Sequence, residues 1–258
     1  MNILDKIIAD KFIEVKERKA VISMQYLEQR DFFDRECLSM KKSLLESTSG
    51  IISEFKRKSP SKGWINKDAD AIEITASYCK NGASGISILT DLPYFGGNPH
   101  DLMVARPLVT CPILRKDFIV DSYQLYEAKS YGADVVLLIA AALSVEQCKT
   151  LASTAHELGL EVLLEVHNEE ELGHMNESVD MVGVNNRNLK DFVVSTDVSL
   201  RLAELIPDDF VKISESGISK PETVKELRKV GYRGFLMGEN FMKEENPALA
   251  LKKFIAAL

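Results

Sequence analysis

The sequence has few cysteines and histidines, and neither type occurs at a spacing that metal sites use. Its 258 residues include four cysteines, which are far apart and form no Cys-x-x-Cys pair, and four histidines that do not cluster. Such a pattern indicates neither a disulfide framework nor a zinc site. Separated thiols are typical of proteins in a reducing cytosol. We therefore expect no metal ion and no disulfide.

Positive charge and long apolar stretches are also scarce. Lysine and arginine number 32 against 39 acidic residues, and the formal net charge of -7 argues against a nucleic-acid-binding surface. No segment approaches the ~20 apolar residues of a membrane span. Acidic residues such as Asp5 and Asp10 interrupt the start of the chain, where a signal peptide needs an unbroken apolar run. These features predict a cytoplasmic protein without nucleic-acid or membrane partners.

Several common phosphate and nucleophile motifs are missing as well. The first strand-like run is not followed by Gly-x-Gly-x-x-Gly, and the chain contains no Gly-x-x-x-x-Gly-Lys-Ser/Thr loop and no nucleophile elbow. Residues 54–60 instead read Glu-Phe-Lys-Arg-Lys-Ser-Pro. This counts against an open, doubly wound sheet, which is the competing architecture considered below.

Apolar strand-like runs do alternate with helix-like segments from about residue 51 onward. We expect strands near residues 51–56, 85–90, 112–117, 134–139, 161–166, 181–185, 210–215 and 233–237. Helical spacing occurs between them, for example over 68–80, 122–131, 144–158 and 221–230, and again from 247. Alternation of this kind produces a parallel sheet, and eight strand and helix units predict an α/β fold, a (β/α)8 TIM barrel.

Residues 1–45 precede the first strand and have helical periodicity. Apolar residues on one face of the first helix are expected at Ile3, Leu4, Ile7, Ile8, Phe12 and Val15. No linker rich in proline, glycine or serine follows them. We expect a single domain over 1–258, with 1–45 as an N-terminal helical extension packed on a barrel of residues 46–258. A separate interaction arm is the alternative.

Five of the apolar runs end in polar residues of types that can act in catalysis or bind a ligand. Glu54 and Lys56 share the strand parity of Ile52 and so face the same way, unless the strand ends at Ser53 and the charges are solvated. In a barrel, the carboxyl ends of the strands share one mouth. The side chains expected to meet there are Glu54, Lys56, Lys116, Glu165, Asn185, Arg187 and Glu215. Acids and lysines in a partly dry mouth can exchange protons near neutral pH.

The loops after the last two strands suggest a phosphate site. Ser216 and Gly217 follow the seventh strand, and Gly238 and Glu239 follow the eighth. Barrels often bind phosphate at these loops through backbone N–H groups. Because a carboxylate would repel phosphate, Glu239 is expected to contribute only its backbone N–H.

Other side chains near the expected mouth have suitable chemistry. Ser59, Lys56 and Arg187 are further phosphate donors, so a small phosphorylated molecule is the expected ligand. Tyr94 and Phe95 after the second strand are placed to wall an aromatic group, and Phe118 after the third can join them.

Six segments resemble the indole-3-glycerol phosphate synthase family, in the family's order. The most specific are Ile-Ser-Glu-Phe-Lys-Arg-Lys-Ser-Pro-Ser at 52–61 and Leu-Arg-Lys-Asp-Phe-Ile at 114–119, and the others are 164–166, 183–189, 214–218 and 235–239. The resemblance implies a single (β/α)8 barrel with no cofactor and no metal. It also implies a carboxy-lyase reaction of tryptophan biosynthesis, in which 1-(2-carboxyphenylamino)-1-deoxyribulose 5-phosphate closes to an indole and loses carbon dioxide and water.

The resemblance also implies roles for individual residues. Lys116 would be the general acid on the ketone oxygen of the substrate, and Glu165 a general acid or base in later proton steps. Glu54 and Lys56 would form a charge pair that positions the substrate or shares those duties. The other residues implied at the substrate are Asn185, Arg187, Glu215 and Ser216, and we add Leu236 and Gly238 of segment 235–239 as candidate binding residues. Which lysine acts at which step stays open.

Two other functions fit parts of the pattern. In a Schiff-base aldolase, Lys56 or Lys116 would attack a sugar-phosphate carbonyl. A barrel kept only for binding a phosphorylated metabolite or for protein interaction is expected to have lost at least one acid or base, and all of them are present. The oligomeric state is also left open, with a monomer as the working expectation.

Overall fold

Eight parallel strands form a closed barrel in the computed structural model, which describes residues 3–188 and 192–258. Neighbouring strands follow the order β1-β10-β9-β8-β7-β6-β5-β4. They are β1 (Ile51–Phe55), β4 (Gly85–Leu89), β5 (Ile113–Lys116), β6 (Val135–Ile139), β7 (Glu161–Val166), β8 (Met181–Asn185), β9 (Val211–Glu215) and β10 (Tyr232–Met237). The predicted (β/α)8 barrel is confirmed, and the open sheet is wrong.

Every strand end lies within one residue of its predicted position. Strand β1 includes Glu54 and Phe55, so the alternative that it stops at Ser53 is wrong. Lys56 lies just beyond it and is followed by a feature that the sequence did not predict, the antiparallel hairpin of β2 (Lys58–Ser59) and β3 (Gly63–Trp64). Such two-residue strands are too short to show an alternating pattern.

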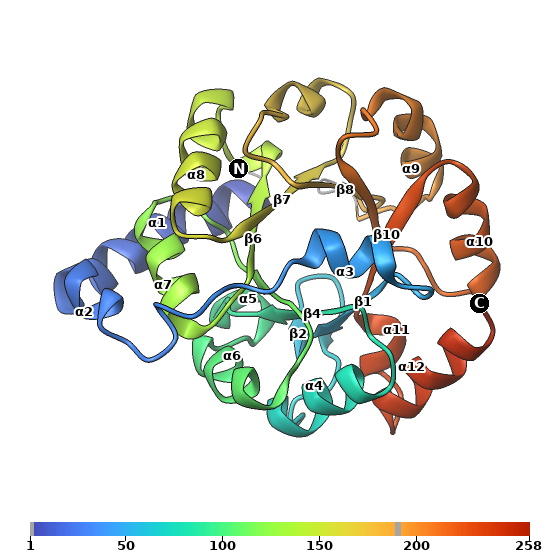
Figure 1. Ribbon diagram of the computed structural model, residues 1–258, viewed down its shortest axis with the longest axis horizontal. Helices are drawn as coiled ribbons and strands as arrows, with labels where there is room; N and C mark the ends of the chain where they lie inside the picture. Colours follow the sequence, from blue (N-terminus) through green and yellow to red (C-terminus); the bar gives the residue numbers. More distant parts are fainter. Residues whose placement is uncertain (1–2, 189–191) are drawn as a thin grey trace.

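Helices surround the barrel on the outside (Figure 1). The longer ones are α4 (Ala71–Lys80), α6 (Pro99–Ala105), α7 (Tyr123–Tyr131), α8 (Val145–Glu157), α9 (Asp197–Leu202), α10 (Pro221–Lys229) and α12 (Pro247–Ala256). Shorter elements are α5 (Leu92–Phe95), α11 (Glu239–Met242) and the 3-10 helices η1 (Arg106–Leu108), η2 (Ala140–Ala142), η3 (Glu170–His174) and η4 (Ala203–Leu205). Between β7 and β8 the described chain forms only η3, so this unit departs from the regular strand and helix alternation.

Alternate strand residues fill the barrel interior. Ile52, Leu114 and Leu236 belong to one buried cluster inside the barrel, while their strand neighbours pack outward against the helices. Helix α3 (Met40–Glu46) closes the end where the strands begin, and its Met40 and Leu44 join the same cluster. A functional site is therefore to be sought at the other end of the barrel, at the carboxyl ends of the strands.

The N-terminal helices α1 (Ile3–Val21) and α2 (Met24–Glu28) precede α3. The buried residues of α1 are Leu4, Ile7, Lys11 and Val15. The expectation that Phe12 lies on this apolar face is wrong, because Phe12 is 50% exposed and Lys11 takes the buried position. Lys11 is tolerated there because its ammonium lies 3.0 Å from both Asp91 and Asp117, at the mouth of the barrel.

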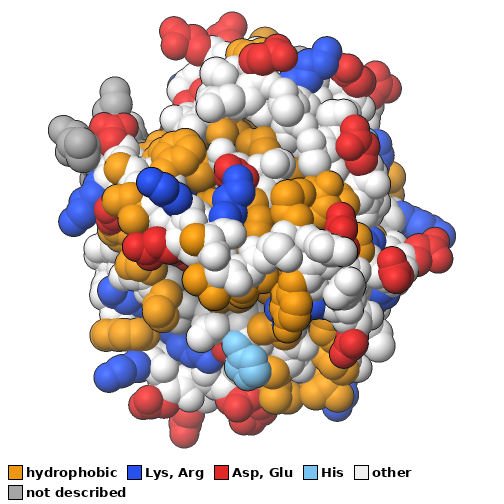
Figure 2. Space-filling model, turned by 90° about the vertical axis from the view of Figure 1, so that its left-hand side faces the viewer, with side chains coloured by type: hydrophobic (Ala, Val, Ile, Leu, Met, Phe, Trp, Pro, Cys, Tyr) orange, Lys and Arg blue, Asp and Glu red, His pale blue; other side chains and the backbone are white. Residues whose placement is uncertain are grey.

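Further ion pairs join α1 to α7 and its preceding loop. Arg18 Nε lies 2.9 Å from Glu127 Oε1, and Lys19 pairs with Asp121 at the same distance. Phe12 and Ile13 of α1 are half or more exposed, and Figure 2 shows hydrophobic side chains between charged ones on the face of the molecule that includes α1.

Candidate active site

A cavity of about 610 Å³ opens at the carboxyl ends of the strands. All but one of the residues that the sequence analysis proposed for the site line it, and Tyr94 is the exception. The lining residues that were proposed are Glu54, Lys56, Ser59, Phe95, Lys116, Phe118, Glu165, Asn185, Arg187, Glu215, Ser216, Gly217, Leu236, Gly238 and Glu239. Leu189, the last residue of one of the six family-like segments, lies outside the described residues. The parallel topology explains this convergence, because most of these residues sit at or near the carboxyl end of a strand, while Ser59 and Phe95 belong to β2 and α5 in the loops that follow β1 and β4.

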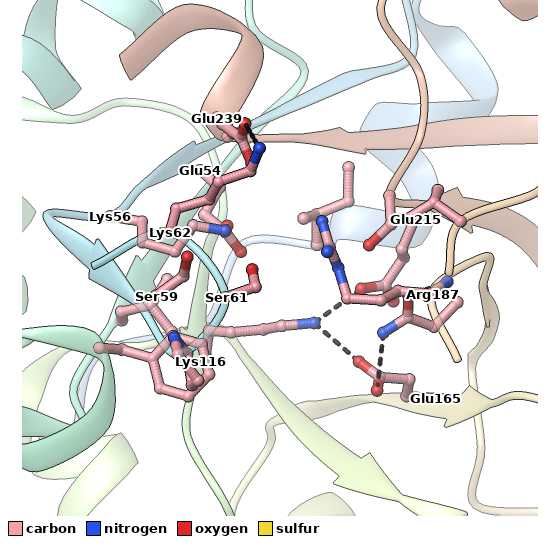
Figure 3. Close-up of a pocket in the computed structure, with 18 of the residues that line it drawn as sticks. Glu54, Lys56, Ser59, Ser61, Lys62, Lys116, Glu165, Arg187, Glu215 and Glu239 are labelled. Carbon is pink, nitrogen blue, oxygen red and sulfur yellow. Dashed lines mark hydrogen bonds and ion pairs between the residues drawn. The ribbon is translucent and has the colours of Figure 1, made fainter. Parts of the chain in front are cut away.

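Lys116 occupies the centre of the site. It ends β5 on the parity of the interior residue Leu114, so its side chain enters the mouth. Its Nζ lies 2.9 Å from Glu165 Oε2 and 2.6 Å from Glu215 Oε2 (Figure 3). Burial disfavours its charge, but the carboxylates of Glu165, Glu215 and Glu54 outweigh burial and raise the pKa of Lys116 above its ordinary value. The free site therefore holds an ammonium group.

Glu165 is buried and has three partners. Its Oε2 accepts from Lys116, its Oε1 accepts from Asn185 Nδ2 at 3.1 Å, and His167 Nε2 lies 3.3 Å from Oε1. Burial opposes ionisation, but the charges of Lys116 and His167 and the hydrogen bond from Lys116 hold the pKa of Glu165 well below its ordinary value. Glu165 is therefore a carboxylate in the free site.

Glu215 differs from Glu165 although both contact Lys116. Burial, together with the nearby carboxylates of Glu165 and Glu54, outweighs the attraction of Lys116 and raises the pKa of Glu215 to about 7. Its Oε1 has no hydrogen-bond partner among the described residues. Gly183 on β8 makes room for it, because a Cβ there would lie 2.3 Å from Glu215 Oε1. The site thus pairs two carboxyl groups of different acidity, as acid and base catalysis requires.

Glu54 and Lys56 form the charge pair that their shared parity predicted. Lys56 Nζ lies 2.5 Å from Glu54 Oε1, and Glu54 is 3% exposed. Gly238 makes room for this carboxylate, since a Cβ at position 238 would lie 2.6 Å from Glu54 Oε1. Glu54 of β1 therefore leaves no room for a side chain at position 238, directly after β10.

The loops after β9 and β10 line the cavity beside the β2–β3 hairpin. Ser216 and Gly217 both have left-handed backbone angles, with φ of 67° and 74°. Ser59 Oγ is buried and has no hydrogen-bond partner among the described residues, so it is available to a ligand. The Glu239 carboxylate faces Lys62, whose Nζ lies 3.8 Å away (Figure 3).

Sequence reasoning missed several residues of this cavity. It did predict the aromatic pair of Phe95 and Phe118, whose ring centroids lie 5.9 Å apart at the cavity wall. Tyr94 instead donates a hydrogen bond to Asp10 of α1. The missed lining residues include Ser61, Lys62 and Lys243, and Ile3, Leu4 and Ile7 of α1. The hairpin places Ser61 and Lys62 there, the docking of α1 places its three residues, and Lys243 directly follows α11 (Glu239–Met242). No local pattern revealed these positions.

Two searches of residues 3–188 and 192–258 were negative. Within these ranges, no group of three or more histidine, cysteine, aspartate or glutamate side chains is arranged to hold a metal ion. None of the helices described has the length and apolar character needed to cross a bilayer.

A family model described as indole-3-glycerol phosphate synthase matches residues 4–254. The chain belongs to the indole-3-glycerol phosphate synthase family. Two curated members illustrate the similarity. The enzyme of Bacteroides thetaiotaomicron is 55% identical over 257 residues, covering 100% of this chain and 99% of its own. That of Salinibacter ruber is 43% identical over 259 residues, covering 99% and 96%.

Solved structures with low sequence identity share the fold. A chain of the tryptophan synthase complex from Pyrococcus furiosus superposes with a TM-score of 0.60 at 19% identity, covering 81% of this chain and 97% of that one. KGPDC from Streptococcus mutans also gives a TM-score of 0.60, at 15% identity, covering 80% and 95%. Both likenesses concern the barrel alone.

Membership confirms the activity that the resemblance implied. Indole-3-glycerol phosphate synthases are lyases of tryptophan biosynthesis and act on a small phosphorylated substrate. The family therefore favours this reaction over a Schiff-base aldolase or a barrel that only binds. The roles of individual residues rest on the geometry described above.

Proposed function

We propose that this cavity closes 1-(2-carboxyphenylamino)-1-deoxyribulose 5-phosphate to indole-3-glycerol phosphate, with Lys116 as the general acid of ring closure. The position of Lys116 between Glu165 and Glu215 supports this assignment most strongly. When the aromatic ring carbon attacks the ketone, negative charge develops on the ketone oxygen. An ammonium group held at the mouth can neutralise that charge and then transfer its proton.

The later steps also need a base and an acid. Carbon dioxide leaves first, and the new hydroxyl then leaves as water while a proton is removed from carbon. Glu165, kept ionised, is suited to accept a proton, with Asn185 holding its Oε1. Glu215 has a pKa of about 7 and can hold or release a proton near neutrality. We assign the Glu54–Lys56 pair to substrate positioning and to a share of these proton transfers.

The remaining residues bind the two ends of the substrate in this proposal. Phosphate is held by Ser59 Oγ and by the backbone N–H groups of the Ser216–Gly217 and Gly238–Glu239 turns, with Arg187 as a further donor. The left-handed turn and the unpartnered Ser59 hydroxyl favour this placement. Glu239 contributes only its N–H, because its carboxylate faces Lys62. Phe95, Phe118 and Leu236 form the apolar wall for the carboxyphenyl ring.

We further propose that residues 1–258 act as one domain, with 1–45 as an extension of the barrel, in a monomeric cytoplasmic enzyme without nucleic-acid or membrane partners. The buried Lys11 pairs with Asp91 and Asp117, which makes α1 part of the structure around the mouth. The net charge of -7 disfavours nucleic acid.

The test is to add the carboxyphenylamino deoxyribulose phosphate to the purified protein and follow indole absorbance and fluorescence. Product formation without any added metal or cofactor is the expected result. Folded protein that yields no indole would overturn the proposal. Borohydride added during turnover separates the aldolase alternative, because a general-acid lysine leaves no reduced covalent adduct.

A further inference from the structure

His167 lies directly after β7 and contacts the site without having been assigned any part in it. Its side chain is 10% exposed. Its Nε2 lies 3.3 Å from Glu165 Oε1, and its Nδ1 lies 3.0 Å from Glu171 Oε2 in η3. The imidazole is therefore enclosed between two carboxylates, one of which belongs to the reacting centre.

Glu171 is held firmly in its orientation toward the ring. Its Oε2 also accepts from the backbone N–H of His167 at 2.7 Å, and its Oε1 accepts from Asn168 Nδ2 at 2.8 Å. The backbone N–H of Glu171 in turn donates to Asn168 Oδ1 at 3.0 Å. These contacts orient the imidazole, in the way that a carboxylate behind a histidine orients a metal ligand.

A ring with a carboxylate at each nitrogen favours the doubly protonated form. Burial alone would disfavour the charge, but the nearby carboxylates of Glu165 and Glu171 outweigh burial and raise the pKa of His167 to about 10. His167 is therefore an imidazolium at neutral pH. Together with Lys116, it places a second cation against the Glu165 carboxylate.

We propose that His167 is a positioning residue that keeps Glu165 ionised after Lys116 has transferred its proton to the substrate. This inference rests on the proposed function, in which Lys116 becomes a neutral amine during ring closure. Glu165 would then be a buried carboxylate without a cation and would compete for the proton. The imidazolium retains both of its protons and supplies the missing counter-charge, so Glu165 remains a base for the next step.

A purely structural role makes different demands on His167. If its contacts served only to fold the segment after β7, the hydrogen bonds that His167 and Asn168 make to Glu171 would suffice. The Nε2 atom and the charge of the ring would then have no effect on catalysis. The two explanations therefore differ in the pH dependence of the reaction and in the protonation state of the ring.

The first measurement needs no activity. Nuclear magnetic resonance of ring-labelled histidine, with His167→Asn used to assign the signal, reports whether the ring is charged. We expect the His167 ring to stay doubly protonated above pH 8. A titration near the ordinary histidine value of about 6.5 would overturn the inference.

The second measurement compares kcat at pH 6 and pH 8. In His167→Asn the amide can still donate to Glu171, but the cation beside Glu165 Oε1 is lost and only Lys116 and Asn185 remain in contact with Glu165. The pKa of Glu165 should then rise, so kcat should fall about tenfold or more at pH 6 and less at pH 8, with little change in KM. His156→Asn is the matched control: it removes a 2.9 Å histidine–carboxylate pair with Asp180 at the other end of the barrel and should leave the pH ratio unchanged.

Glu171→Gln covers the case in which His167→Asn does not fold. It keeps the ring and an acceptor for Nδ1 but removes one charge, so the same shift should appear in weaker form. If a folded variant had the same ratio of kcat at pH 8 to kcat at pH 6 as the wild type, the inference would be overturned. The proposed synthase function would not be affected by that result. If the wild-type protein formed no indole at all, the proposed function would fail, and the resonance measurement would still decide the charge of His167.

Discussion

Replacing Glu215 by glutamine should make the protein more stable and less active above neutral pH. The buried carboxyl has a folded-state pKa of about 7 instead of its ordinary 4.5. A group whose pKa is raised by folding stabilises the folded state fully below its unfolded pKa. That contribution is lost as the pH rises through the folded pKa. A shift of this size corresponds to about 3 kcal/mol, so the ionised Glu215 costs the wild type up to that amount at pH 8.

Glutamine removes this cost because it does not ionise, and its amide oxygen can still accept from Lys116. The assay is urea unfolding of both proteins at pH 5 and pH 8. We expect Glu215→Gln to gain up to about 3 kcal/mol relative to wild type between these two pH values. Thermal unfolding should show an increase of several degrees at pH 8. The kcat of the variant should fall, since a carboxyl that exchanges protons is gone.

The control is Glu46→Gln on α3, where the carboxylate is 68% exposed. Surface changes of this kind typically stay within about 0.5 kcal/mol, and this one should do so at both pH values. If the stability difference between Glu215→Gln and wild type did not depend on pH, the reasoning about burial and charge at Glu215 would be refuted.

Three further changes test the proposed roles. Lys116→Ala should lower kcat about a hundredfold to ten-thousandfold with little change in substrate affinity, and arginine should not rescue it, because guanidinium does not release its proton. Lys58→Ala is the control, and its kcat should stay within about tenfold of wild type, since the Lys58 ammonium donates to a backbone carbonyl of α5. A near-normal kcat in Lys116→Ala would instead assign the general-acid role to Lys56. Gly238→Asp should raise KM, because the new carboxylate repels the substrate phosphate. It should also lower kcat, because any Cβ at position 238 meets Glu54 Oε1. Unchanged kcat and KM in a folded variant would disprove the phosphate placement. Losses from Glu54→Gln and Lys56→Met should combine to less than their product, whereas fully multiplicative losses would show that the pair is not a unit.

Local sequence pattern was sufficient for the barrel and for the direction of its key side chains. Apolar runs and helical segments alternate along the chain, and this periodicity can be read from neighbouring residues alone. Parity then places Glu54 with Ile52, and Lys116 with Leu114, on the interior face. A parallel barrel brings all strand ends to one mouth, so the proposed site residues could be grouped before any contact was known.

Only the tertiary structure decided which of these residues touch, and therefore how each one is charged. Lys116 meets Glu165 across 49 residues of sequence and Glu215 across 99, and those contacts, with burial, separate the two carboxyl groups in acidity. Burial and pairing are sums over neighbours in space, which no local pattern contains. The same reason explains why Lys11 is buried on α1, since its carboxylate partners come from other elements. The partners of His167 are close in sequence, but only the path of the chain from β7 into η3 brings Glu165 and Glu171 to opposite nitrogens of its ring.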